Sequence, residues 1–493
     1  MGGSSDMREM AVMVNEAPSD HAKDMALSRD DSNPIYLQIC ARFKTAIAEG
    51  RLVPGDRVPS VRTLASELGL SRGTVNLAYQ ILAEEGYLKF RGAAGTFVDL
   101  RLKTTGAARS ASSVQGHAPA EPSSNVRPFQ LGLPALDAFP RKTWNRLVSH
   151  CSRRLSAEQL GYPDPAGLMA LRERIAAYLA FSRGIVCRPE QVFVTSGHRA
   201  SLELIQRSLY RPGDGIWFED PGYPIAREFL LSINARLHPV PVDRDGLVVE
   251  EGRRRAPEAR FAIVTPANQS PLCVMMAKDR RAELLKWAEE GQRWIIEDDY
   301  DSEYRYNRRP PLSLKAMDRG ERVLFTGSFS KVLYPALRLA YLVVPPSEVD
   351  RFERACRLGG AGCPVFHQAV IADFIEQGYF VRHLKKMRAL YAERRQLLVD
   401  AMHDVFGDGA KAISPPAGLH LVMQFQGYRA PSIKVAALAQ ADGFGLQPLS
   451  LWHMEPPSID GLLLGFTNLA SRHMAQSFAT RLKDICIAAD RNG

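Results

Sequence analysis

The chain has 493 residues, of which 45% are hydrophobic and 24% are charged, and its formal net charge is +9. This length exceeds the rough prior of about 100–200 residues for one domain, so we expect more than one domain. The composition is that of a globular protein with a large core, and the positive charge favours an anionic partner such as nucleic acid.

The sequence carries no signal for secretion, membrane insertion or disulfide bonding. Residues 1–32 are polar and are expected to form a disordered tail rather than a signal peptide. No run of about 18 apolar residues occurs, which excludes a membrane-spanning helix. The seven cysteines lack C-x-x-C spacing, so we expect reduced thiols and neither a disulfide framework nor a metal site. These features predict a cytoplasmic protein with no membrane partner.

Residues 33–98 have the pattern of a small helical module that ends in a hairpin. Apolar residues recur at helical spacing over 35–48, and Ser60 and Ser71 are placed to cap helices at 61–68 and 72–85. Two short strands, 87–91 and 95–98, follow. Two short helices joined by a tight turn and followed by a hairpin predict a winged helix-turn-helix.

The third helix of this module is the expected reader of the DNA major groove. Its first turns, the start of the preceding helix and the wing carry side chains that can reach phosphates and base edges. The predicted DNA contacts are Arg62, Ser71, Arg72, Thr74, Asn76, Tyr79 and Arg91. On the pattern alone, a helical interaction domain with a solvated charged face is the alternative. The segments VPSVRTLA (58–65), LSRGTV (70–75) and AYQILAEEGYL (78–88) resemble the GntR family of bacterial regulators, which implies binding to double-stranded operator DNA.

Residues 99–128 are small and polar and cannot bury a core, so a flexible linker is predicted there. From residue 129 to 490, short apolar strands alternate with helical segments. That alternation predicts an α/β domain with a mostly parallel sheet. The expected strands are 192–195, 215–218, 260–264, 294–297, 323–326 and 339–343, and a long helix over about 380–405 leads into a final α+β portion.

Polar segments follow five of these strands, at the edge of an α/β sheet where ligand sites form. The segments are TSGHR (195–199), PGYP (221–224), TPANQSP (265–271), EDDYD (297–301) and SFSK (328–331). Each alone is compatible with a helix cap, a turn or a surface loop. A lysine beside groups that bind a dianion suits imine chemistry with a phosphorylated aldehyde, and five such segments in succession favour a site over turns.

Together these segments resemble the fold-type I pyridoxal-phosphate enzymes of the aspartate aminotransferase superfamily. The resemblance implies that Lys331 forms the internal aldimine and that Asp298 holds the pyridine nitrogen protonated, with Asp299 as the competing choice. Asn268 and Tyr300 are then expected at the ring hydroxyl and Tyr223 on the ring face. The residues implied for the phosphate are Ser196, Gly197, His198, Arg199, Ser328, Ser330 and Arg338, with Tyr162 reaching the phosphate of a neighbouring subunit.

A GntR-type winged helix ahead of an aminotransferase-like domain is the arrangement of the MocR/GabR subfamily, which the chain resembles over nearly all of residues 33–490. The segments GYPDPAG (161–167) and EDDYDSE (297–303) are similar to those of that subfamily. The resemblance implies a homodimeric, pyridoxal-phosphate-dependent regulator that responds to an amine-bearing small molecule or to the cofactor itself.

Three departures from the pattern bear on function. Arg199 replaces the usual Gln, Leu272 and Cys273 replace the usual Thr-Gly, and Leu463 stands where aminotransferases commonly carry an arginine for the substrate carboxylate. The last departure favours a sensor over the alternative, an active aminotransferase with an appended DNA-binding domain. A third possibility, a cofactor-free domain used only for dimerisation, is disfavoured because the set of cofactor residues is complete.

Overall fold

The computed structural model describes residues 33–99, 126–156, 160–306, 312–359, 362–457 and 459–491. The chain forms two compact units, Met1–Pro119 and Ala120–Gly493. The predicted tail (1–32) and residues 100–125 of the predicted linker lie outside the described residues.

The described part of the first unit is a three-helix module with a small antiparallel sheet in the order β1-β3-β2. Its elements in chain order are α1 (Ile35–Ala48), β1 (Arg57–Val58), α2 (Val61–Glu67), α3 (Arg72–Glu84), β2 (Leu88–Phe90) and β3 (Thr96–Val98). The predicted serine caps are present, because Ser60 Oγ accepts from the Thr63 N–H and Ser71 Oγ accepts from the Thr74 N–H, both at 3.1 Å. The predicted winged helix-turn-helix is confirmed. Strand β1 was not predicted, since two residues are too few for a recognisable pattern.

The second unit is built on an eight-stranded sheet in the order β4-β11-β10-β9-β8-β5-β6-β7. Its strands are β4 (Val192–Thr195), β5 (Gly215–Asp220), β6 (Arg236–Asp243), β7 (Gly246–Leu247), β8 (Phe261–Val264), β9 (Trp294–Asp299), β10 (Val323–Ser328) and β11 (Ala340–Val343). The helices along this part of the chain are α4 (Arg141–Arg154), α5 (Met169–Arg183), α6 (His198–Leu209), α7 (Pro224–Ser232), α8 (Val249–Arg255), α9 (Lys278–Glu290), α10 (Leu314–Met317), α11 (Val349–Leu358) and α12 (Val365–Glu376).

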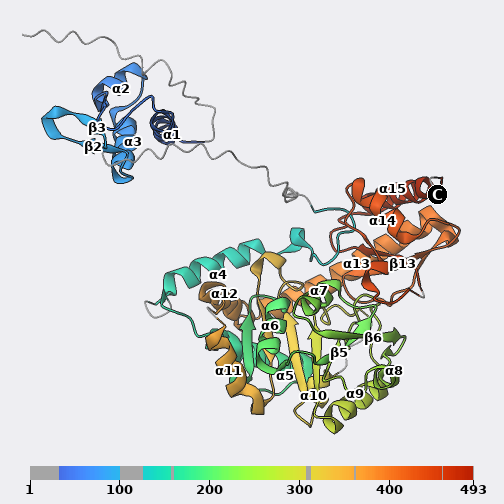
Figure 1. Cartoon of the computed structure of the whole chain (residues 1–493). Coiled ribbons are helices and arrows are strands. Elements are labelled where there is room, and N and C mark those ends of the chain that lie inside the picture. The colour runs from blue at the N-terminus through green and yellow to red at the C-terminus, as the bar shows by residue number, and fades with distance from the viewer. Residues whose placement is uncertain are drawn as a thin grey trace, which may run out of the picture. The chain divides into compact units, whose positions relative to one another are not determined.

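Helices cover both faces of this sheet (Figure 1). Consecutive strand residues point to opposite faces, and Leu324 packs into a core with α6, α7 and α11 while Phe325 packs into a different core with α5 and α12. All residues of β8 and β9 are therefore buried. Such burial on both faces is typical of parallel strands in α/β proteins, and it confirms the predicted fold class.

Two features of the sheet differ from the expectation. Strand β11 runs antiparallel to both of its neighbours, β10 and β4, although the strands from β10 to β6 are parallel as predicted. Strand β6 was missed because Pro239 and Pro241 interrupt its pattern. Prolines are tolerated there because β6 lies near the sheet edge, beside only the two-residue strand β7.

The chain ends in a smaller antiparallel sheet, reached through the long predicted helix. The elements are α13 (Tyr379–Phe406), β12 (Ala410–Ala412), β13 (His420–Phe425), α14 (Ser432–Ala441), β14 (Gln447–Pro448), β15 (Leu462–Gly465) and α15 (Arg472–Arg491). The strand order is β12-β13-β15-β14, and α13 packs along α15 (Figure 1). Among the helices in the described ranges, none has the length and apolar character needed to cross a membrane.

Candidate functional site

The polar segments that follow the parallel strands meet around one cavity of about 540 Å³ in the larger unit. The carboxyl ends of neighbouring parallel strands lie at the same edge of a sheet, so residues far apart in the sequence converge there. We call the ionisable and hydroxyl side chains on this side of the cavity the sheet wall: His198, Asp298, Tyr300, Asp301, Ser328 and Lys331.

Lys331 lies in the turn after β10 with its amine inside the cavity. Its Nζ donates to the Gly132 carbonyl at 2.8 Å, and burial lowers the pKa of this amine, opposed by the charges of Asp301 and Asp298. A lysine with a lowered pKa is more often unprotonated and therefore nucleophilic. Gly132 has a φ of +75°, and a Cβ at this position would lie 2.6 Å from the amine. The close approach thus requires glycine.

Asp298 and Asp299 lie on opposite faces of β9. Asp298 Oδ1 accepts from Thr326 Oγ1 at 3.1 Å and lies 3.3 Å from His198 Nδ1, and burial raises the pKa of its carboxyl. Asp299 instead forms a buried ion pair with Arg183, at 2.7 Å between Oδ2 and Nε. Because the side chains of a strand alternate, only Asp298 lines the cavity.

Asn268, Tyr300 and Asp301 form a hydrogen-bonded group on the same wall. Asn268 Nδ2 donates to Asp301 Oδ1 at 2.7 Å and to Tyr300 Oη at 3.3 Å. Burial raises the pKa values of Asp301 and Tyr300 well above their ordinary values. No role was predicted for Asp301, although it lies in the EDDYD segment, two residues beyond Asp299, and this position is a usable signal.

The predicted phosphate residues converge only in part. Helix α6 begins at His198 after Gly197, whose φ is +120°. A Cβ on Gly197 would lie 3.2 Å from the Arg338 guanidinium, so the two predicted residues are neighbours. The Ser330 N–H donates to Ser328 Oγ at 3.2 Å, and Ser328 lines the cavity. Ser196 is exposed and lines a different, smaller pocket.

Two predicted residues point away from the cavity. The Arg199 guanidinium lies over the Phe229 ring at 5.4 Å from its centroid and 3.6 Å from Glu203, with 63% of its side chain exposed. Only the backbone N–H of Arg199, in the first turn of α6, remains suited to an anion. Tyr162 is fully exposed, as expected of a side chain that reaches a second subunit.

Other lining residues of the cavity come from segments in which the sequence showed no motif. We call this set the outer wall: Leu131, Ile225, Gln440, Gln447, Leu451 and Trp452. Tyr223 also lines the cavity, with its ring centroid 5.9 Å from that of Trp452. Asp220 fixes the segment that follows Trp452, because its carboxylate accepts from the N–H groups of Met454 (2.8 Å) and Glu455 (3.1 Å).

In the smaller unit, most of the predicted DNA contacts lie on the surface. Arg62, Arg72 and Asn76 are exposed, as is Arg91, whose guanidinium lies 5.1 Å from the Phe97 ring centroid. Ser71 is also exposed, and the N–H of partly buried Thr74 donates to it.

The prediction that Tyr79 contacts DNA is wrong. Its side chain is buried, its ring packs edge-on against Phe43, and its hydroxyl donates to the Pro59 carbonyl at 2.9 Å. On α3 it lies on the same face as Val75 and Leu82, which belong to the core.

Comparisons with known proteins identify the family. Residues 35–98 match the family described as "Bacterial regulatory proteins, gntR family". Residues 139–452 match the family described as "Aminotransferase class I and II". The chain is 36% identical over 482 residues to the probable rhizopine catabolism regulatory protein MocR of Rhizobium meliloti, covering 95% of this chain and 97% of the relative. The chain belongs to the MocR-type regulators of the GntR family. It is also 30% identical to the pyridoxine biosynthesis transcriptional regulator PdxR of Corynebacterium glutamicum, covering 90% and 94% of the two chains.

The larger unit of this regulator is similar to solved aminotransferases. A kynurenine aminotransferase of Pyrococcus horikoshii superimposes with a TM-score of 0.67 at 25% identity, covering 74% of this chain and 92% of that one. The predicted family, the two-domain architecture and the aminotransferase-like fold are thereby confirmed. The GntR-type domain implies DNA binding.

The cavity of this regulator fits pyridoxal phosphate, the cofactor typical of the class I aminotransferase fold. Of the buried polar atoms without a hydrogen-bond partner among the described residues, three belong to His198, Asp301 and the Asp301 partner Asn268: His198 Nε2, Asn268 Oδ1 and Asp301 Oδ2. Buried polar atoms are rarely left unpaired, so these atoms favour a polar ligand in the cavity. The first turn of α6 and Arg338 provide N–H donors for a dianion.

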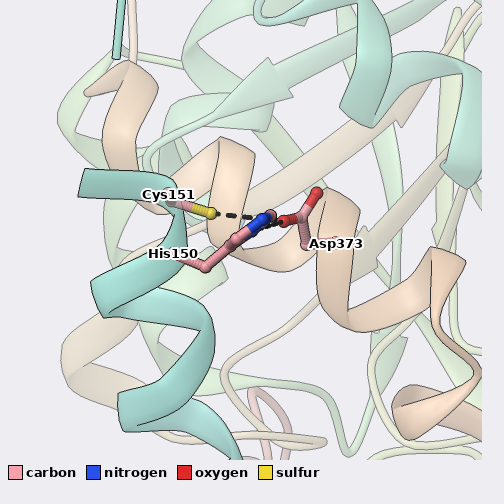
Figure 2. A group of neighbouring side chains, drawn as sticks. All are labelled: His150, Cys151 and Asp373. Atoms are coloured by element: carbon pink, nitrogen blue, oxygen red, sulfur yellow. Dashed lines mark hydrogen bonds and ion pairs between the residues drawn. The ribbon is translucent and has the colours of Figure 1, made fainter. Parts of the chain in front are cut away.

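A second cluster of chemically active side chains lies away from this cavity, between α4 and α12 (Figure 2). Asp373 Oδ2 lies 3.5 Å from the Cys151 thiol, which donates to it, and 3.3 Å from His150 Nδ1. Burial and the Asp373 charge raise the pKa of Cys151 to about 11, so the thiol keeps its proton. A metal ligand would be a thiolate. We therefore interpret this cluster as a hydrogen-bonded contact that holds the two helices together.

Proposed function

We propose that this MocR-type regulator binds pyridoxal phosphate at Lys331 and senses an amine-bearing metabolite there. The observation that carries the proposal is the buried Lys331 amine, which shares one cavity wall with Asp298 while a surface-exposed recognition helix belongs to the same chain.

The sheet wall and its neighbours supply residues suited to this cofactor. Asp298, which faces the cavity while Asp299 points to the other face of β9, is suited to hold the pyridine nitrogen protonated. Asn268 and Tyr300 are suited to bind the ring hydroxyl. Tyr223 is suited to cover the ring face. The residues proposed for the phosphate are Ser196, Gly197, His198, Arg199 (through its backbone), Ser328, Ser330 and Arg338, with Tyr162 serving the partner of a homodimer.

Sensing requires an exchange at Lys331. When bound, the cofactor supplies an aldehyde carbon that forms a C=N bond to an amine. An effector amine would exchange with Lys331 at this carbon and release the lysine amine, one amine for another, so no oxidant or reductant would be needed. The freed amine and the altered contacts then favour one of two conformations. A tenfold change in operator affinity requires about 1.4 kcal/mol of difference in effector binding between them.

A catalytic aminotransferase is the alternative, and the geometry around Leu463 counts against it. Leu463 is fully buried in β15 in an apolar cluster with Val422, Leu449 and Trp452. No arginine for a substrate carboxylate occupies this place. Steady-state turnover of an amino acid with a 2-oxo acid at about 1 per second or faster would favour the enzyme, whereas single slow half-reactions would favour the sensor.

The decisive variant is Lys331→Ala. It is expected to abolish the visible absorbance of the holo-protein and the effector-dependent part of operator binding, while basal operator binding persists. Lys286→Ala, at an exposed position on α9, is the matched control and should change neither. If Lys331→Ala leaves both the absorbance and the effector response intact, the proposal fails.

A further inference from the structure

The cavity holds few cationic side chains that could pair with an acidic group of an effector. Among the described lining residues, Arg227 and Lys331 are the arginine and lysine side chains present, and two histidines join them. Arg227 already donates to the backbone carbonyls of His453 and Leu451, both at 2.9 Å. Two of its five N–H groups are therefore engaged in holding the outer wall, which leaves fewer for a ligand.

The histidines and acids of the cavity make an anion less favourable still. His420 Nε2 lies 2.8 Å from the Pro271 carbonyl, and burial lowers the pKa of its ring, so it is neutral. Glu228, Asp298 and Asp301 also line the cavity, and none of them can supply a positive charge. A carboxylate or sulfonate placed here would lose its hydration with only the partly engaged Arg227 to offset that loss.

The outer wall instead offers apolar surface and neutral hydrogen-bonding groups. Ile225, with 55% of its surface exposed, stands at the cavity near Trp452 and Leu451. The Gln440 side-chain nitrogen donates to the Leu446 carbonyl, which leaves its oxygen as an acceptor. The Gln447 oxygen accepts from Trp452 Nε1, which leaves its nitrogen as a donor. An acceptor beside a donor suits hydroxyl groups, because each hydroxyl can both donate and accept.

We propose that the effector is a hydroxylated amine without a carboxylate or sulfonate, whose amine reaches Lys331 while its hydroxyls meet Gln440 and Gln447. This inference rests on the proposed function, since it concerns the amine that exchanges at Lys331. It narrows the effector class to amino alcohols and amino polyols and excludes α- and ω-amino acids.

Matched pairs of small amines test the inference on the holo-protein. Serinol and serine differ in one carbon, which is a hydroxymethyl group in serinol and a carboxylate in serine, and ethanolamine and taurine differ similarly in a sulfonate. The dissociation constants would be measured from the visible spectrum and, independently, from the ligand-induced rise of the thermal midpoint. We expect serinol and ethanolamine to bind at least about tenfold more tightly than their acidic partners, a difference of about 1.4 kcal/mol.

A charge-adding variant sharpens the test. Ile225→Arg places a cation at the cavity and should shift the preference toward serine by about tenfold. Leu231→Arg is the matched control, because Leu231 is 52% exposed on the same helix, α7, but does not line the cavity. Its preference should equal that of the native protein.

The outcomes separate the two proposals. Equal or tighter binding of serine and taurine in the native protein overturns the inference but leaves the sensor intact. Absence of a Lys331-dependent absorbance, or failure of every amine to change it, overturns the proposed function and the inference with it.

Discussion

The two walls of the cavity differ in origin and in chemistry. The sheet wall is made by side chains at the ends of β4, β9 and β10, and it holds buried ionisable groups that are fixed by hydrogen bonds. The outer wall comes from Leu131, from Ile225 on α7 and from the segment between Gln440 and Trp452, and it is mostly apolar or neutral. The difference shows how one cavity can combine cofactor-type residues fixed at strand ends with a separate set of residues, on other segments, that can differ in ligand specificity.

The largest expected effect is a difference in stability between variants of Asp298 and Asp299, two neighbouring carboxylates of β9. Asp299→Asn breaks the buried pair with Arg183 and should lower the free energy of unfolding by about 3–5 kcal/mol. Asp298→Asn makes the same change on the opposite face and should lose cofactor affinity with a much smaller loss of stability. Denaturation followed by tryptophan fluorescence measures this, because all five tryptophans lie in the larger unit. Equal destabilisation by both variants would contradict the separation.

The second prediction concerns the pH dependence of stability that arises from Glu219, a buried residue of β5. Buried Glu219 accepts from Thr265 Oγ1 at 2.6 Å, and burial raises the pKa of its carboxyl from 4.5 to about 7. Because the folded-state pKa is raised, the stability associated with protonated Glu219 is full below pH 4.5 and is lost as the pH rises to about 7. The loss is on the order of 3 kcal/mol at about 1.4 kcal/mol per pH unit.

Glu219→Gln should remove this dependence, so its free energy of unfolding should change less than that of the native protein between these pH values. Chemical denaturation at a series of pH values measures the difference. Glu258→Gln, which removes one exposed carboxyl, is the matched control. An unchanged pH profile in Glu219→Gln would show that another group is responsible.

Gly132→Ala tests the close approach of the Lys331 amine to Gly132 in the cavity. A Cβ would approach the Lys331 amine to 2.6 Å and would strain a backbone at φ +75°. We expect at least about a tenfold loss of cofactor affinity, or about 1.4 kcal/mol, measured by spectral titration of the apo-protein. Gly443→Ala has a similar φ of +87° with no atom near its Cβ, and it controls for strain alone.

The smallest expected effect lies in the outer wall. Gln447→Leu removes the hydrogen bond to Trp452 Nε1 and should cost about 1 kcal/mol of effector binding, a severalfold change. Cofactor affinity should remain that of the native protein. Loss of cofactor affinity in this variant would contradict the proposal that the sheet wall binds the cofactor while the outer wall binds the effector.

The sheet wall was predictable from the sequence because each of its groups follows an apolar run at a strand end. Burial on both faces makes such runs continuous, and parallel strands bring their carboxyl ends together. The choice between Asp298 and Asp299 needed the structure, because adjacent residues differ only in the face of the strand to which they point.

The outer wall was not predictable, and the physical reason is its construction. Gln440 belongs to a helix, Gln447 to a two-residue strand and Trp452 to a single helical turn, so no spacing connects them. Tyr79 failed for a different reason. Exposed and buried positions lie next to each other along α3, and a tyrosine side chain can occupy either kind of position.

The hydrogen bond between Lys331 and Gly132 also has a mechanical consequence. Gly132 follows directly on the segment by which the chain enters the larger unit after residues 100–125, the covalent route from the DNA-binding unit. That segment is anchored where the Pro128 carbonyl accepts from Gly445 at 2.7 Å and the Phe129 carbonyl accepts from Gly465 at 3.0 Å. A change in bonding at the Lys331 amine would therefore alter a hydrogen bond to the chain only a few residues after these two anchors, near the point where the described part of the larger unit begins.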